Sequence, residues 1–234
     1  MIIIPTFNPN DKSLEFLNSL FKKKIFEQNN IIILNDGSFL NESKKIYENI
    51  NNLGIKVIHS NYNYGKGAMI KEGIKYAKSI DSKYVIVADG DGQHLVEDID
   101  KIKNNIDKNY DLIIGCRNFN VKNIPIRNKL SNKFINLIIN VLLGYKFKDS
   151  QCGLRYINNK LFDLALNIEA NKFNFELEFL VNVKNKFSIK EIPIETVYDK
   201  NNYQTNFRYL SDSYLIIKSL IKFYYFKNIK NKNK

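Results

Sequence analysis

Five short aliphatic runs alternate with amphipathic segments through the first half of the sequence, and few folds accommodate such an alternation. The runs have the length of β-strands and are almost continuously apolar, as strands are when helices cover both faces of their sheet. The runs are residues 1–4, 31–34, 55–59, 84–88 and 111–115, and the segments with helical spacing are residues 11–23, 42–52, 67–79 and 96–106. The pattern predicts an α/β fold with a mostly parallel central sheet flanked by helices.

The second half of the sequence contains two long and largely apolar segments with helical spacing, at residues 127–145 and 210–226. In the first, the polar residues form one narrow stripe that consists of Lys129, Lys133, Asn136 and Asn140. In the second, Lys218 and Lys222 lie on one side. Helices of this kind are buried on most sides or lie in an interface. Residues 190–199 are predicted to form a further strand.

The formal net charge is +12, and its distribution indicates what the protein binds. The segment from Lys218 to the C-terminal residue holds six lysines and no acidic residue, and it overlaps a hydrophobic stretch. This pattern favours an anionic membrane surface, and we expect no nucleic-acid partner because zinc-finger, RNP and basic-zipper motifs are absent from the sequence. No run reaches the ~18 apolar residues of a membrane span, and the first residues do not resemble a signal peptide. We expect a cytoplasmic protein, peripheral on the inner face of the membrane.

Polar motifs follow three of the predicted strands, namely "PTFN", "NDGS" and "DGDGQH". Ligands bind beyond the carboxyl ends of the strands in open α/β sheets. In the third motif, Asp89 and Asp91 start on one face of an extended segment, and Gln93 adds an amide oxygen. Two carboxylates and an amide suit a hard divalent cation, Mg²⁺ or Mn²⁺. An ordinary acidic turn accounts for the same residues, because Asp and Gly are common in turns.

The segment "YNYGKGAMIKEG" places glycines on both sides of Lys66 at a predicted helix start. Backbone N–H groups at the beginning of a helix attract anions, so the segment is a candidate phosphate site. Its spacing is not that of a Walker loop or a Rossmann fingerprint. The alternative is that Gly65 and Gly67 only permit close packing of the helix.

Taken in order, the motifs resemble those of the family 2 glycosyltransferases with the GT-A fold, in particular the dolichyl- and polyprenyl-phosphate mannose and glucose synthases. The resemblance extends from residue 2 to about residue 226 and rests on "PTFN", "NDGS", "NYGKGAMIKEG", "DGDGQH", "GCRNF", "RNKLSN", "DSQCGLRY", "FNFELEFL", "IPIETVY" and "NFRYLSDS". It implies an inverting, metal-dependent transferase that moves a sugar from a nucleotide-sugar, a UDP-sugar rather than GDP-mannose, to a polyprenyl phosphate.

The resemblance also assigns roles to individual residues of this chain. The residues implied around the base and ribose are Pro5, Phe7 and Asp36, and the implied ligands of Mg²⁺ or Mn²⁺ are Asp89, Asp91 and Gln93. The residues implied to bind donor or acceptor phosphates are Lys66, Arg117, Arg127 and Arg208. The expected catalytic residues are Asp91, Arg117 and Asp149, of which Asp149 is the candidate base for a hydroxyl acceptor. A loop hydrogen-bond role for Asp149 is the alternative.

The sequence departs from the family pattern in three of its motifs. The Glu that usually follows P-T-[YF]-N is Pro9, and the usual first Asp of D-D-G-S is Asn35. The prolines that usually follow Gln-His are replaced by Leu95 and Val96. The first change puts one contact to the ribose or base in doubt, and the last is expected to alter the loop after the acidic pair.

Residues 1–209 are expected to form a single GT-A catalytic domain, and residues 210–234 an amphipathic helix with a basic tail that associates with a membrane. The expected partners are a nucleotide-sugar donor, a polyprenyl-phosphate or other lipid-linked acceptor, and an anionic membrane surface. Two other functions stay open: transfer to a glycan or glycolipid hydroxyl in cell-envelope polysaccharide synthesis, and non-catalytic binding of a nucleotide-sugar. The apolar helices can instead be core or homodimer contacts.

Overall fold

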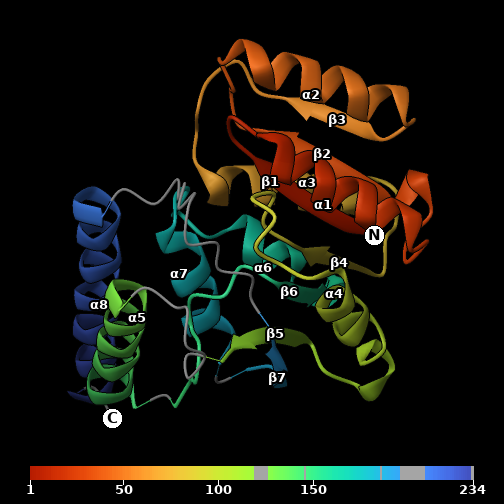
Figure 1. Cartoon of the computed structure of the whole chain (residues 1–234). Coiled ribbons are helices and arrows are strands. Elements are labelled where there is room, and N and C mark those ends of the chain that lie inside the picture. The colour runs from red at the N-terminus through yellow and green to blue at the C-terminus, as the bar shows by residue number, and fades with distance from the viewer. Residues whose placement is uncertain (119–125, 145, 185, 196–208, 233–234) are drawn as a thin grey trace.

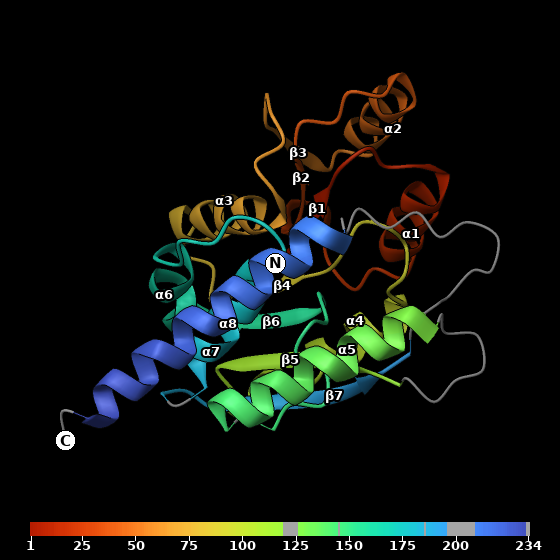
Figure 2. The same ribbon diagram turned by 90° about the vertical axis from the view of Figure 1, so that its left-hand side faces the viewer.

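The computed structural model describes residues 1–118, 126–144, 146–184, 186–195 and 209–232. A seven-stranded sheet with the order β3-β2-β1-β4-β6-β5-β7 lies at its centre. Helices flank this sheet, and α1 and α3 lie on opposite sides of its N-terminal strands (Figures 1 and 2). The predicted α/β class with a mostly parallel sheet is therefore confirmed.

The first half of the chain forms the strands and helices that the alternation of aliphatic and amphipathic segments predicts. The strands are β1 (Ile2–Thr6), β2 (Ile31–Asn35), β3 (Lys56–His59), β4 (Tyr84–Val87) and β5 (Leu112–Arg117). The helices between them are α1 (Asp11–Lys22), α2 (Asn41–Asn52), α3 (Lys66–Ser79) and α4 (Val96–Lys103), with short 3₁₀ turns at Gln28–Asn30 and Ile106–Lys108. The isoleucines of β1 and β2 are fully buried, because helices cover the sheet on both faces.

One strand was not anticipated from the sequence, and it sets the geometry of the edge at which β4 and β5 end. Strand β6 (Arg155–Asn158) lies between β4 and β5 and is antiparallel to both, whereas β7 (Ile189–Ile194) pairs parallel with β5. Because β6 runs in the opposite direction, its beginning lies at the edge where β4 and β5 end. The loop that precedes β6 therefore reaches the same edge as the acidic motif after β4.

The second half adds helices along one side of the sheet. They are α5 (Ile126–Ile138), continued by the π-helical turn η3 (Ile139–Leu143), then α6 (Phe162–Leu166) after the 3₁₀ turn Asn159–Leu161, α7 (Asn174–Val183) and α8 (Tyr209–Lys232). The motif "FNFELEFL" is thus helical. Helices α5 and α8 lie side by side as an outer pair (Figures 1 and 2). No helix in the described part of the chain is long and apolar enough to cross a bilayer.

Helix α8 packs firmly on α7. Ile216 and Leu220 of α8 are buried in the core. Beneath them, the hydroxyl of Ser219 donates to the carboxylate of Glu178 over 2.6 Å, and the amide of Asn174 donates to the hydroxyl of Ser219 over 3.1 Å. The expected division into residues 1–209 and 210–234 stays a prediction.

The polar stripe predicted on α5 is divided between two environments. Lys133 is exposed, but Asn136 is buried, as is Asn132, which the stripe did not include. The side chain of Lys129 lies outside the described residues. The inner face of α5 therefore carries two buried asparagines among apolar side chains, and the outer face of α5 and η3 carries exposed apolar side chains, among them Leu137 and Val141.

Candidate active site

The loops after β1 and β2 meet at the carboxyl edge of the sheet. Asn8 accepts a hydrogen bond at its side-chain oxygen from the backbone of Phe39 (3.0 Å) and donates its own N–H to the Ser38 hydroxyl (2.8 Å). The rings of Phe7 and Phe39 meet edge to face, with centroids 5.9 Å apart. The structure thus brings Phe7 and the "NDGS" loop together at this edge, whereas Pro5 lies within β1, opposite Leu34.

Asp36 connects this edge to the loop that precedes α3. Its carboxylate accepts N–H groups from Tyr64 (2.7 Å) and Gly65 (3.0 Å). Burial raises the pKa of Asp36, and these two backbone donors partly offset the increase. Asp36 therefore fixes the start of α3, and its predicted contact with the nucleotide stays a prediction.

Asn35, one of the departures from the family pattern, has a local explanation. Its amide group donates to Nδ1 of His59 (2.9 Å), and its side-chain oxygen accepts the backbone N–H of Ser38 (2.8 Å). An aspartate at this position could pair with the same ring nitrogen only by accepting a hydrogen from it, whereas the asparagine amide donates one. Asn35 thus satisfies both neighbours as a neutral side chain.

Lys66 opens α3 and lies between two acidic side chains from different parts of the chain. Its Nζ is 2.5 Å from Oδ1 of Asp89 and 2.8 Å from Oε1 of Glu176, which comes from α7. Burial alone would lower the pKa of Lys66, but the two carboxylates outweigh burial and raise it well above its usual range. Burial opposes ionisation of Asp89 too, and the positive charge of Lys66 reverses this and lowers the pKa of Asp89 well below its usual range.

The glycines beside Lys66 have a packing role. A Cβ atom at Gly67 would lie 2.4 Å from the Cβ of Phe175, and one at Gly65 would lie 2.6 Å from the carbonyl oxygen of Asn171. The helix start can approach α7 this closely only without side chains at both positions. This close approach is what brings Lys66 within reach of Glu176.

Asp91 has far less compensation for its charge than Asp89. Burial and the neighbouring charge of Asp89 both raise its pKa, and the backbone N–H of Gln93 donates a hydrogen bond to its carboxylate at 3.0 Å. His94 is buried, with Nε2 3.5 Å from Oδ2 of Asp89 and with no hydrogen-bond partner for Nδ1 among the described residues. A cation beside Asp91 would supply the missing positive charge.

The donor set fits a divalent cation that takes only part of its ligands from the protein. No group of three or more His, Cys, Asp or Glu side chains in the described part of the chain is arranged to hold a metal ion. Asp91 and the amide of Gln93 are hard oxygen donors, and Asp89 is already paired with Lys66. Mg²⁺ and Mn²⁺ accept such partial coordination, because they complete their shells with water and phosphate oxygens.

Gly153 brings the loop before β6 against Asp89. A Cβ atom at this position would lie 2.3 Å and 2.6 Å from the two carboxylate oxygens of Asp89. Only a glycine therefore fits between the loop and the acidic pair.

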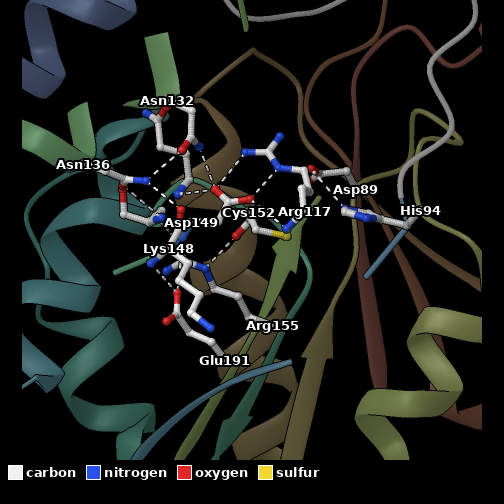
Figure 3. A network of polar contacts seen from close by, with 12 residues as sticks. Asp89, His94, Arg117, Asn132, Asn136, Lys148, Asp149, Cys152, Arg155 and Glu191 are labelled. Atoms are coloured by element: carbon white, nitrogen blue, oxygen red, sulfur yellow. Dashed lines mark hydrogen bonds and ion pairs between the residues drawn. The ribbon is translucent and has the colours of Figure 1, made fainter. Parts of the chain in front are cut away.

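Asp149, also from the loop before β6, is fully buried and holds Arg117 (Figure 3). Its carboxylate accepts two side-chain hydrogen bonds from Arg117, at 2.6 and 3.0 Å, and a third bond from the Arg117 backbone. Asn132 and the backbone of Gln151 complete a set of five donors. Burial opposes ionisation of Asp149, but Arg117 outweighs it and lowers the pKa. The geometry favours the loop hydrogen-bond role, because a saturated carboxylate of low pKa is a weak base.

Two of the predicted phosphate ligands cannot be placed. Arg208 lies outside the described residues, as does the side chain of Arg127, whose backbone belongs to the first turn of α5. Sequence reasoning indicated a salt bridge or a cap for Glu176 without identifying Lys66 as its partner, and it missed the position of Asn132 beside Asp149. Asparagines spaced four apart in an apolar helix, at residues 132 and 136, were the available signal for the position of Asn132.

Residues 1–165 match the family described as Glycosyl transferase family 2. Among curated relatives, the chain is 32% identical over 216 residues to a UDP-N-acetylglucosamine–dolichyl-phosphate N-acetylglucosaminyltransferase of Methanococcus voltae, covering 84% of this chain and 85% of that protein. It is 29% identical over 222 residues to a dolichyl-phosphate beta-glucosyltransferase of Saccharomyces cerevisiae, covering 82% and 65%.

A solved structure shares the architecture. Glucosyl-3-phosphoglycerate synthase from Mycobacterium tuberculosis, crystallised with Mn²⁺, uridine diphosphate and phosphoglyceric acid, superposes with a TM-score of 0.72 at 12% identity, covering 94% of this chain and 76% of that one. At this identity the match describes the fold, which is GT-A. The family match over most of the chain, together with the relative at 32% identity, establishes that this protein belongs to glycosyl transferase family 2 and is a glycosyltransferase.

Proposed function

We propose that the enzyme transfers a sugar from a UDP-sugar to a polyprenyl phosphate, with inversion at the sugar and with Mg²⁺ or Mn²⁺ bound. The clustering of Lys66, Asp89 and Asp91 at the carboxyl edge of the sheet carries the proposal, because it combines a positive charge with an under-compensated carboxylate. Relatives named as dolichyl-phosphate sugar transferases support the acceptor class.

The reaction breaks the bond between the sugar C1 and the diphosphate while an acceptor oxygen forms a new bond to C1 from the opposite face. When bound, the divalent cation neutralises charge on the departing diphosphate. Asp91 and Gln93 would hold the cation, and Asp89 keeps Lys66 at the edge of the site, 2.5 Å away. Arg117, oriented by Asp149, binds phosphate oxygens as a planar donor.

A phosphate acceptor explains why the site needs no strong base. A lipid phosphate is already an anion at neutral pH, so its oxygen attacks without losing a proton first. A hydroxyl acceptor would require a carboxylate base. Asp149, the candidate for that role, is engaged by five donors.

The outer pair of helices supplies a surface for the lipid. A groove of about 370 Å³ between α5–η3 and α8 is lined only by apolar side chains, those of Leu137, Ile138, Val141, Ile217, Leu220 and Ile221. Lysines continue beyond it along the sequence of α8, with no acidic residue after Lys218. We assign this face to an anionic bilayer on the cytoplasmic side, since each lysine near such a surface contributes about 1 kcal/mol.

A thermal-shift experiment tests the donor and the cation together. A UDP-sugar with Mn²⁺ is expected to raise Tm by roughly 5–10 °C at about a hundred times its Kd, and a chelator is expected to remove most of the shift. GDP- and CMP-sugars serve as matched controls. A shift by GDP-mannose alone would refute the donor assignment, and a shift that chelation leaves intact would refute the role of the cation.

A vesicle-binding experiment tests the membrane face. Val141 is 71% exposed, so Val141→Glu is expected to leave Tm unchanged and to lower partition onto anionic vesicles by about tenfold, the effect of losing one buried apolar side chain. Phe39→Glu, an equally exposed site in the loop between β2 and α2, is the control. If Val141→Glu instead converts a dimer into monomers and vesicle binding is unaffected, the face is a contact between two copies.

A further inference from the structure

Helix α5 carries two buried asparagines on the face that points into the protein. Asn132 is 4% exposed and Asn136 is 8% exposed, and they are one helical turn apart. Burying an amide costs free energy unless its donors and acceptors are paired. The neighbouring helix positions on this face, such as Ile135 and Ile139, are apolar, so the two amides require a specific reason.

The asparagines form a continuous hydrogen-bonded path from α5 to Arg117 (Figure 3). The amide of Asn136 donates to Oδ1 of Asn132 (2.7 Å) and to the backbone carbonyl of residue 148 (2.8 Å), and its oxygen accepts the Ser150 hydroxyl (2.6 Å). The amide of Asn132 in turn donates to Oδ1 of Asp149 (2.7 Å). Asn136 thus orients Asn132, and Asn132 reaches the carboxylate that holds the guanidinium.

The bond from Asn132 restrains the orientation of Asp149. Oδ2 of this carboxylate faces Nε and the backbone of Arg117, and Oδ1 faces Nη2 and Asn132. A donor on the α5 side opposes rotation of the carboxylate about its Cβ–Cγ bond, and a fixed carboxylate plane fixes the plane of a guanidinium paired to both oxygens. A neutral donor does this without competing for the charge of Arg117.

We propose that Asn132 is a positioning residue of the transferase, which orients Asp149 and through it the guanidinium of Arg117 toward the phosphate that Arg117 binds. The proposal rests on the proposed function for the role of Arg117, and it assigns α5 a part in the active site as well as at the protein surface. Asn132 itself contacts no substrate.

The decisive variant is Asn132→Asp, which keeps the shape of the side chain and removes its hydrogens. The charged group in contact with Asn132 is Asp149, which is paired with Arg117, and Glu191 and Arg155 lie in the same network (Figure 3). Two adjacent carboxylates share a proton at a raised pKa, so the new side chain regains a donor as the pH falls. We expect kcat to fall at least tenfold at pH 8, KM for the donor to change less than threefold, and kcat relative to wild type to recover near pH 5.5.

Two further variants separate positioning from folding. Asn132→Leu removes the donor permanently, so the same loss of kcat is expected without recovery at low pH. Lys133→Asp adds a negative charge to the exposed side of the same turn and is expected to behave as wild type. Wild-type kcat in both Asn132 variants, or no recovery of Asn132→Asp at acidic pH, would overturn the proposal.

A measurement that needs no turnover keeps the inference independent of the proposed function. The ¹⁵N-resolved Nε–H signal of Arg117, assigned with Arg117→Lys, is expected to exchange with solvent at least tenfold faster in Asn132→Leu than in wild type or Lys133→Asp. If wild type transfers no sugar but the exchange result holds, the proposed function fails and the positioning survives. Equal exchange rates in all three proteins would refute the positioning role of Asn132 and leave the proposed function unaffected.

Discussion

Asp91→Asn is expected to lower kcat by about 10²–10³-fold or more, while the free energy of unfolding of the ligand-free protein stays constant or increases. The two effects have one cause. Burial and the charge of Asp89 raise the pKa of Asp91, so its ionised form is held at a cost that only a bound cation would offset. Asp91→Asn removes the negative charge, and with it both the free-energy cost of holding that charge and the carboxylate that binds the cation. Steady-state kinetics and urea unfolding on the same preparation measure both effects.

The control for this variant is an equally conservative change far from the site. Asp163 is 74% exposed at its side chain and pairs with Lys78, so Asp163→Asn is expected to retain full activity. Retention of more than a tenth of wild-type kcat by Asp91→Asn would mean that the carboxylate does not hold the cation, and the metal-assisted mechanism would be wrong.

Lys66→Met is expected to destabilise the protein by about 3–5 kcal/mol, the usual effect of removing one partner from a buried ion pair. The substitution keeps the length of the side chain but leaves the carboxylates of Asp89 and Glu176 facing each other without a cation. Urea unfolding at pH 7 measures the loss. Lys75→Met, on the same helix and 60% exposed in its pair with Glu72, is expected to change stability by less than about 1 kcal/mol.

The loss in Lys66→Met has a defined pH dependence. Lys66 lowers the pKa of Asp89 in the folded protein, so the pair stabilises above the unfolded pKa of about 4 and loses that stability as the pH falls further. In Lys66→Met the two carboxylates left together share a proton at a raised pKa, so the difference between wild type and variant is expected to be largest near pH 8 and to shrink as the pH falls. A difference that grows toward low pH would contradict the ion-pair assignment.

The carboxyl edge of the sheet could be predicted from the sequence because it depends on local signals. Apolar runs identify the strands, and turn-forming residues after them identify the edge at which side chains such as Asp89 and Asp91 gather. The direction of a strand has no such signal. Strand β6 is only four residues long and contains Arg155, so it reads as a continuation of the loop "DSQCGLRY". The antiparallel direction of β6 brings Asp149 and Gly153 to the site. That direction is set by pairing with β4 and β5, which are distant in the sequence.

The roles of single polar residues were equally inaccessible before the packing was known. Asp149 has the residue type of a general base, and only its five donors show that it holds Arg117. Periodicity placed Asn136 in one polar stripe with Lys133, yet Asn136 is buried and Lys133 is exposed. Helical spacing gives the angle of a side chain around the axis, and it does not say which neighbour covers that angle.

The contact between Ser219 and Glu178 has a practical consequence for anyone preparing the protein. A shortened version that ends before Tyr209, made to improve solubility, would leave the carboxylate of Glu178 without the Ser219 hydroxyl that donates to it over 2.6 Å. It would also expose the apolar surface against which Ile216 and Leu220 pack. Such a truncation is expected to aggregate. Replacing exposed residues such as Tyr214 and Tyr225 on the intact helix is the safer route to a well-behaved sample.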